Sequence, residues 1–133
     1  MTGDDLPPVT LILDRTALLA YAAGSMHAAE PVGQVLENGT CYGVPVPAVV
    51  EALAVVPGAE RSALEWLLTQ SGCAILPTSG DDWQELSFWH GVTGRYDAAA
   101  ALLCAFEHDA AILASDVKAY PAAEGLPVIY FPA

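Results

Sequence analysis

Four acidic residues stand out because of their places along the chain. Asp14 directly follows the apolar run VTLIL, and Asp116 follows a second apolar run, AAILA. Glu51 interrupts the apolar stretch AVVEALAVV, and Asp97 lies near the start of RYDAAAALLCAFEH. Carboxylates that a fold brings to one point repel each other, and a hard divalent cation such as Mg²⁺ or Mn²⁺ relieves that repulsion by taking oxygen ligands. These residues therefore predict a metal site, provided that the fold gathers them.

Each acid also has an ordinary explanation. Asp14, Asp97 and Asp116 lie near expected helix starts, where aspartate is a favoured cap or first-turn residue. Glu51 would cost several kcal/mol if it were ionised, buried and unpaired. It must therefore be exposed, paired with a cation-bearing side chain or bound to a metal, and the sequence alone leaves these possibilities open.

Alternating strands and helices must position these acids. Short apolar, β-leaning runs predict strands at residues 9–13, 42–46, 73–76, 110–114 and 127–131. Helical patterns are expected at residues 16–23, 31–37, 47–56, 59–70, 79–89 and 95–108, with Pro31 in the first turn of the second, and a further short helix after Asp116. Such alternation predicts a parallel sheet with helices on both faces. Ligands of these sheets bind beyond the carboxyl ends of the strands, where Asp14 and Asp116 lie.

The composition describes one strongly acidic domain. The chain has 133 residues, 54% of them hydrophobic, which suits a single domain over residues 9–133 after a short flexible lead-in at residues 1–8. Sixteen acids against four bases give a net charge of −12, so a basic field that would steer nucleic acid to the protein is missing. The sequence shows neither a secretory signal nor a membrane-length apolar run, and its three widely spaced cysteines predict reduced thiols in a cytoplasmic protein.

The order of the motifs resembles the PIN-domain family, and the VapC-type ribonuclease toxins in particular. LILDRTALLAY is similar to the family's strand-Asp-x-Ser/Thr element, with Thr16 two residues after Asp14. PVPAVVEAL resembles the family's motif that carries a glutamate, here Glu51. YDAAAALLCAFEHDAAILASDVKAY resembles the Asp-helix-strand-Asp block, and it has the expected length between Asp97 and Asp116. The resemblance covers almost the whole chain.

This resemblance implies a three-layer α/β/α fold with about five parallel strands in the order 3-2-1-4-5. It also implies a Mg²⁺-dependent (or Mn²⁺-dependent) endoribonuclease of a toxin-antitoxin pair, which hydrolyses RNA phosphodiester bonds and leaves a 5′-phosphate. The catalytic metal ligands would be Asp14 and Asp97, with Glu51 and Asp116 acting directly or through water. One metal would activate a water, and a second would stabilise the leaving oxygen.

Neighbouring residues receive supporting roles from the same resemblance. Thr16 and Ser115 would orient ligands or a water, while Arg15 and Arg95 would contact RNA phosphate. The ordinary alternative for both arginines is a surface ion pair. One departure from the family is Ala114, which stands where a hydroxyl residue is usual two positions before the last aspartate.

The implied partners are RNA, a second copy of the chain and a cognate antitoxin or other DNA-binding regulatory protein. Two competing interpretations remain. The chain could be a catalytically weak or inactive PIN-fold binding module that acts by pairing with such a regulator, or it could be an acidic scaffold or DNA mimic. The three tryptophans, Trp66, Trp83 and Trp89, are expected to fill the core or, alternatively, to anchor a partner.

Overall fold

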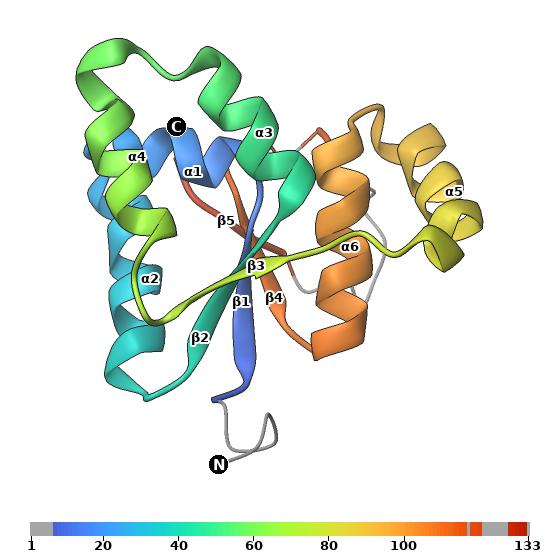
Figure 1. Cartoon of the computed structure of the whole chain (residues 1–133), viewed down its shortest axis with the longest axis horizontal. Helices are drawn as coiled ribbons and strands as arrows, with labels where there is room; N and C mark the ends of the chain where they lie inside the picture. Colours follow the sequence, from blue (N-terminus) through green and yellow to red (C-terminus); the bar gives the residue numbers. More distant parts are fainter. Residues whose placement is uncertain (1–6, 117, 121–127, 133) are drawn as a thin grey trace.

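A five-stranded, all-parallel β-sheet forms the middle layer of the molecule (Figure 1). The computed structural model describes residues 7–116, 118–120 and 128–132. The strands are β1 (Val9–Leu13), β2 (Cys41–Pro45), β3 (Cys73–Leu76), β4 (Ala111–Ala114) and β5 (Val128–Tyr130). Their order is β3-β2-β1-β4-β5, which confirms the predicted fold class and strand order. β4 lies directly beside β1, so the residues that follow these two strands meet at one edge of the sheet.

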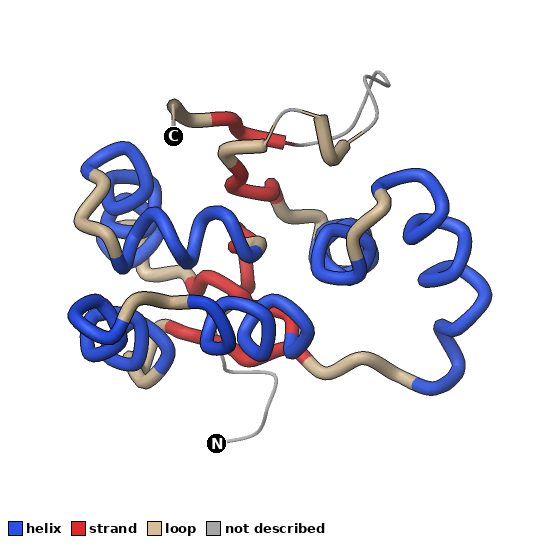
Figure 2. Tube along the Cα trace, turned by 90° about the horizontal axis from the view of Figure 1, so that it is seen from above, coloured by secondary structure: helices blue, strands red, loops and turns tan. Residues whose placement is uncertain are grey.

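Helices cover both faces of this sheet. They are α1 (Arg15–Ala22), α2 (Met26–Glu37), α3 (Val46–Val55), α4 (Arg61–Leu68), α5 (Trp83–Thr93) and α6 (Tyr96–His108). Helices α1, α2 and α4 lie on one side of the strands, and α5 and α6 lie on the other (Figure 2). Helix α3 follows β2 at once and contacts both α1 and α6. This arrangement is the three-layer sandwich expected from the sequence.

Alternation along β1 divides the core into two parts. Leu11 and Leu13 pack in the core cluster that includes residues of α1, α2 and α4, while Ile12 packs against Leu102 and its neighbours on α6. Such alternation follows from the two-residue side-chain period of a strand. The buried face of α6 is rich in alanine, so the helix lies close against the sheet. Helix α6 therefore presents its first turn, which contains Asp97, at the edge where the strands end (Figure 1).

The second helix differs from the sequence-based expectation. Helix α2 begins at Met26, five residues before the predicted start, and Pro31 lies inside it. The Ser25 hydroxyl accepts a hydrogen bond from the Ala28 amide at 3.4 Å and caps the helix. Proline is common in the first turn of a helix, but the capping serine and the buried side chains that follow it set the actual start. The predicted lead-in and the short helix after Asp116 lie mostly outside the described residues.

Two of the three tryptophans are surface residues. Trp66 and Trp83 are 55% and 65% exposed, so the core-filling interpretation is wrong for them. Trp89 packs against two of the buried clusters and forms an edge contact with Phe88 and a tilted contact with Phe106. Across the described ranges, every helix is too short or too polar to cross a membrane.

Candidate functional site

Asp14 lies at the junction of β1 and α1, and it is fully buried. Its Oδ1 atom accepts hydrogen bonds from the Ala17 amide at 3.0 Å and from the Thr16 hydroxyl at 2.6 Å. Its Oδ2 atom accepts a hydrogen bond from the Tyr120 hydroxyl at 2.6 Å. Asp14 is thus the helix cap that the ordinary explanation predicts, and its second oxygen remains directed toward other groups.

Asp97, in the first turn of α6, is also fully buried. Its Oδ2 atom accepts a hydrogen bond from the Arg15 amide at 2.9 Å. That amide is the first of α1, and the first amides of a helix have no partner within the helix. Asp97 therefore satisfies the start of a helix that is distant in sequence, rather than capping its own.

Asp116 follows β4 at the same edge of the sheet. Its side chain is 41% exposed, and its Oδ1 atom accepts a hydrogen bond from the Lys118 amide at 3.0 Å. The turn that follows β4 thus fixes the direction of the carboxylate. Because β4 is the parallel neighbour of β1, Asp116 and Asp14 both follow strands that end at the same edge of the sheet.

A single guanidinium group joins these three carboxylates. Arg95 donates from Nε to Asp97 Oδ1 at 2.9 Å and from Nη2 to Asp97 Oδ2 at 2.6 Å. It also reaches Asp116 Oδ2 from Nη1 at 3.2 Å and Asp14 Oδ2 from Nη2 at 3.5 Å. The Arg95 side chain is 14% exposed, so this is a largely buried network and not the surface ion pair expected as the ordinary alternative. We refer to Asp14, Asp97 and Asp116 as the acidic triad.

Glu51 lies beside the acidic triad and has its own cation. Its Oε1 atom accepts a hydrogen bond from Arg15 Nη1 at 2.7 Å, and both side chains are about one-third exposed (30% and 32%). The Arg15 main chain bonds to Asp97 while its side chain bonds to Glu51, so Arg15 connects the two groups. Glu51 is therefore paired, which is one of the possibilities left open by its apolar surroundings.

Thr16 links the ends of β1 and β4. Its hydroxyl donates to Asp14 and accepts a hydrogen bond from the Ser115 amide at 3.0 Å. Ser115 thus takes part through its main chain. Ala114, which stands where a hydroxyl was expected, has its methyl group fully buried in the core. In this chain the Thr16 hydroxyl orients Asp14.

Sequence reasoning missed Tyr120. Its side chain is 4% exposed, and its hydroxyl bonds to an aspartate 106 positions earlier in the chain. Nothing in the run SDVKAYP marks this tyrosine as different from an ordinary core residue. The one available signal was its position, because Tyr120 is a hydroxyl donor four residues after Asp116.

Burial and pairing shift the ionisation of the site. Burial raises the pKa of Asp14, although the hydrogen bonds from Thr16, Tyr120 and Ala17 and the charge of Arg95 oppose the shift. Burial, together with the charge of Asp14, raises the pKa of Tyr120 and keeps its hydroxyl a donor. Burial alone would lower the pKa of Arg95, but the hydrogen bonds and charge of Asp97 outweigh it and raise that pKa. The guanidinium therefore stays charged.

The acidic triad suits a divalent cation in its chemistry but not in its present spacing. All three side chains offer hard carboxylate oxygens on the ends of rigid elements, which Mg²⁺ and Mn²⁺ prefer. Among the residues that the structure describes, however, no three acidic, histidine or cysteine side chains are spaced to hold a metal ion. The Arg95 guanidinium lies among the triad carboxylates and takes their oxygens. The three residues fit the ion only if this side chain moves.

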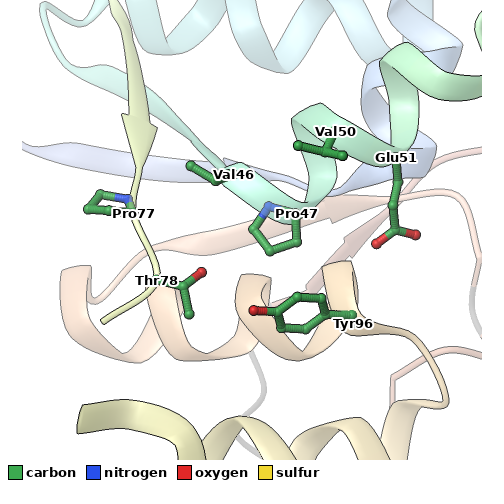
Figure 3. A pocket seen from close by; sticks show the side chains of 7 residues that line it. All are labelled: Val46, Pro47, Val50, Glu51, Pro77, Thr78 and Tyr96. Atoms are coloured by element: carbon green, nitrogen blue, oxygen red, sulfur yellow. The ribbon is translucent and has the colours of Figure 1, made fainter. Parts of the chain in front are cut away.

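A largely apolar hollow of about 470 Å³ opens beside Glu51. Helix α3 supplies Val50 and Glu51 to its wall, the segment after β3 supplies Pro77, and α6 supplies Tyr96 (Figure 3). The Tyr96 ring is 45% exposed. The hollow therefore offers an accessible aromatic surface next to one of the candidate site carboxylates.

Comparisons with known proteins support the fold. No family model matches the chain, and no curated protein matches it. One similar solved structure is described as a toxin-antitoxin complex from Klebsiella pneumoniae. The two chains superpose with a TM-score of 0.63 at 18% sequence identity, over 90% of this chain and 96% of the other. At this identity the similarity establishes a shared fold.

Proposed function

We propose that this chain is a divalent-metal-dependent endoribonuclease that acts as the toxin-like member of a toxin-antitoxin pair. One observation carries the proposal: a single cationic group contacts all three carboxylates of the acidic triad. The three side chains come from the residue after β1, the first turn of α6 and the turn after β4, and all three reach the same guanidinium group. A set of helix caps with no further role would not need to converge in this way.

The residues of the site have separate tasks in this proposal. Asp14, Asp97 and Asp116 would hold the metal, and Glu51 would take part through a water or after release from Arg15. A bound metal would lower the pKa of a coordinated water and polarise the scissile phosphate. Thr16 and Tyr120 keep Asp14 in place by hydrogen bonds to different oxygens.

The strongly acidic surface demands another source of RNA affinity. Without the triad and Glu51, twelve acids still face four bases, a net charge of −8. Phosphate contacts usually dominate nucleic-acid affinity, and Arg15 and Arg95 are already paired with carboxylates. Stacking of a base on the exposed Tyr96 ring does not depend on net charge and contributes about 1–3 kcal/mol per base in single-strand binding sites. The hollow beside Glu51 would receive that base.

The proposed pairing with an antitoxin draws support from the similar structure, which comes from a toxin-antitoxin complex. A basic partner would complement the net charge of −12. Dimer formation by the chain itself remains a prediction.

Metal-dependent cleavage and metal binding test the proposal together. The purified protein is titrated with Mn²⁺ by calorimetry, and a mixed single-stranded RNA is incubated with it in the presence of Mg²⁺. Asp97→Asn, shown by circular dichroism to be folded, should abolish both signals because it removes one charge from the triad. Asp109→Asn is the matched control, since it makes the same chemical change at an exposed position at the other end of α6. Cleavage that survives in Asp97→Asn would not depend on the acidic triad and would contradict the proposal.

A second candidate function is a binding module that keeps the fold and acts through its partner. The observation in its favour is the charge compensation of the triad by Arg95, which stabilises the acids without any metal. Saturable Mn²⁺ binding without RNA cleavage, together with tight binding of a DNA-binding regulatory protein, would favour this candidate over the nuclease.

A further inference from the structure

Arg95 occupies an unusual place for an arginine. It is the residue immediately before α6, and its side chain folds back so that Nε, Nη1 and Nη2 all bond to carboxylates. Burial of a guanidinium costs several kcal/mol unless ion pairs and hydrogen bonds of good geometry compensate it. The planar fork of arginine provides this compensation because it matches carboxylates in a bidentate manner. The position is thus built around a cation that the chain itself supplies.

The bonds of Arg95 use the same oxygens that a metal would need. Both oxygens of Asp97, Oδ2 of Asp14 and Oδ2 of Asp116 face the guanidinium. The remaining oxygens of Asp14 and Asp116 accept from main-chain amides. A divalent cation cannot use the inward-facing oxygens while the fork holds them, so the two cations exclude each other.

The local charge favours such an exchange. When all three carboxylates are ionised, the acidic triad carries a charge of −3, and the Arg95 guanidinium reduces the net charge of the cluster to −2. The triad without Arg95 attracts a divalent cation more strongly, because the positive guanidinium that would repel the cation at contact distance is gone. Arg95 thereby lowers metal affinity both sterically and electrostatically.

We propose that Arg95 is a built-in competitor of the divalent cation, so that the metal binds the acidic triad only when this guanidinium swings out. The inference rests on the proposed metal-dependent function and adds its regulation. At low metal concentration the chain is held in a stable, metal-free and inactive arrangement. Any partner or substrate that draws Arg95 outward, such as an RNA phosphate, would promote metal binding.

A calorimetric Mn²⁺ titration of the full chain and two variants tests the competition. Arg95→Gln removes the competing charge, and we expect its dissociation constant for Mn²⁺ to fall at least tenfold relative to the unsubstituted protein. Arg61→Gln is the control, because it removes the same charge from an exposed ion pair on α4, in which Arg61 Nε lies 3.8 Å from Glu65 Oε1. The control should bind Mn²⁺ within twofold of the unsubstituted protein.

A second measurement does not depend on the folding of Arg95→Gln, in which two buried aspartates lose their partner. The Arg95 Nε–H resonance of the unsubstituted protein, labelled with ¹⁵N, is followed while Mg²⁺ is added. The paired and largely buried group should give a slowly exchanging signal that disappears or shifts as the metal displaces it. If Mg²⁺ binds and the signal persists unchanged, the competition does not exist.

The outcomes separate the inference from the function on which it rests. If Arg95→Gln binds Mn²⁺ more tightly and the Arg61→Gln control does not, the result supports the competition. Equal Mn²⁺ binding by Arg95→Gln and the unsubstituted protein overturns the competition and leaves the metal-dependent function intact. Absence of saturable Mn²⁺ binding by every protein, including folded Arg95→Gln, overturns the metal-dependent function, and the inference fails with it.

Discussion

Removal of one hydroxyl group from the site should destabilise the protein measurably. Tyr120→Phe deletes the hydrogen bond of 2.6 Å to Asp14 Oδ2, and both side chains are buried. A hydrogen bond to a charged group contributes about 1.5–3 kcal/mol. Phenylalanine retains the ring and its packing, so the loss should come from the unmatched carboxylate. We therefore expect the free energy of unfolding, measured with urea, to fall by about 1.5–3 kcal/mol, with an unchanged denaturant slope.

Two controls isolate the effect of the carboxylate. Tyr42→Phe removes a hydroxyl that is equally buried but donates to the neutral main-chain oxygen of Leu67, and it should cost about 0.5–1.5 kcal/mol. Tyr96→Phe alters an exposed ring and should change stability by less than about 0.5 kcal/mol. If Tyr120→Phe costs no more than Tyr42→Phe, the Tyr120 hydroxyl does not stabilise an ionised Asp14.

The remaining predictions concern packing and thiol chemistry. Gly43→Ala should lower the free energy of unfolding by about 1–3 kcal/mol, because the new Cβ would lie 2.6 Å from Leu76 Cδ1. Gly33 lies on α2 with open space around it, so Gly33→Ala should raise the free energy of unfolding by up to about 1 kcal/mol. Unfolding by urea measures both effects. Iodoacetamide at pH 8 should label Cys73 and Cys104 slowly in the folded protein, because burial raises the pKa of these thiols to about 11 and about 12. If mass spectrometry detects rapid labelling of Cys104 before urea is added, the result would contradict the burial of this thiol.

The sequence predicted the backbone positions of the site better than its side-chain contacts. The strand order places the ends of β1 and β4 side by side, so Asp14 and Asp116 lie at the same edge of the sheet. In contrast, the contacts of Arg95 depend on one flexible side chain that folds back over the start of α6. A sequence pattern shows that an arginine lies next to an acid, but it does not show that the same arginine reaches two further acids.

The misplaced start of α2 has a similar origin. Proline at residue 31 and serine at residue 25 both favour a helix start, and local preferences alone do not rank them. The burial of Ala28 and Val32 against the sheet decides in favour of the longer helix. Trp66 was expected to be in the core but is exposed, because a large apolar side chain does not by itself establish burial.

The capping and functional explanations of the acids turn out to be compatible, since a carboxylate has two oxygens. Asp14 uses Oδ1 for the amide of Ala17 at the start of α1 and directs Oδ2 toward Tyr120 and Arg95. Asp97 likewise supports the amide of Arg15 while it binds the guanidinium. Substitution of either aspartate therefore disturbs the fold as well as the candidate site, and loss of activity alone would not separate the two effects. Arg95 stands at the N-cap position of α6, but its side chain makes no capping hydrogen bond. The effect of a change at Arg95 on metal affinity therefore distinguishes a functional cluster from a purely structural one.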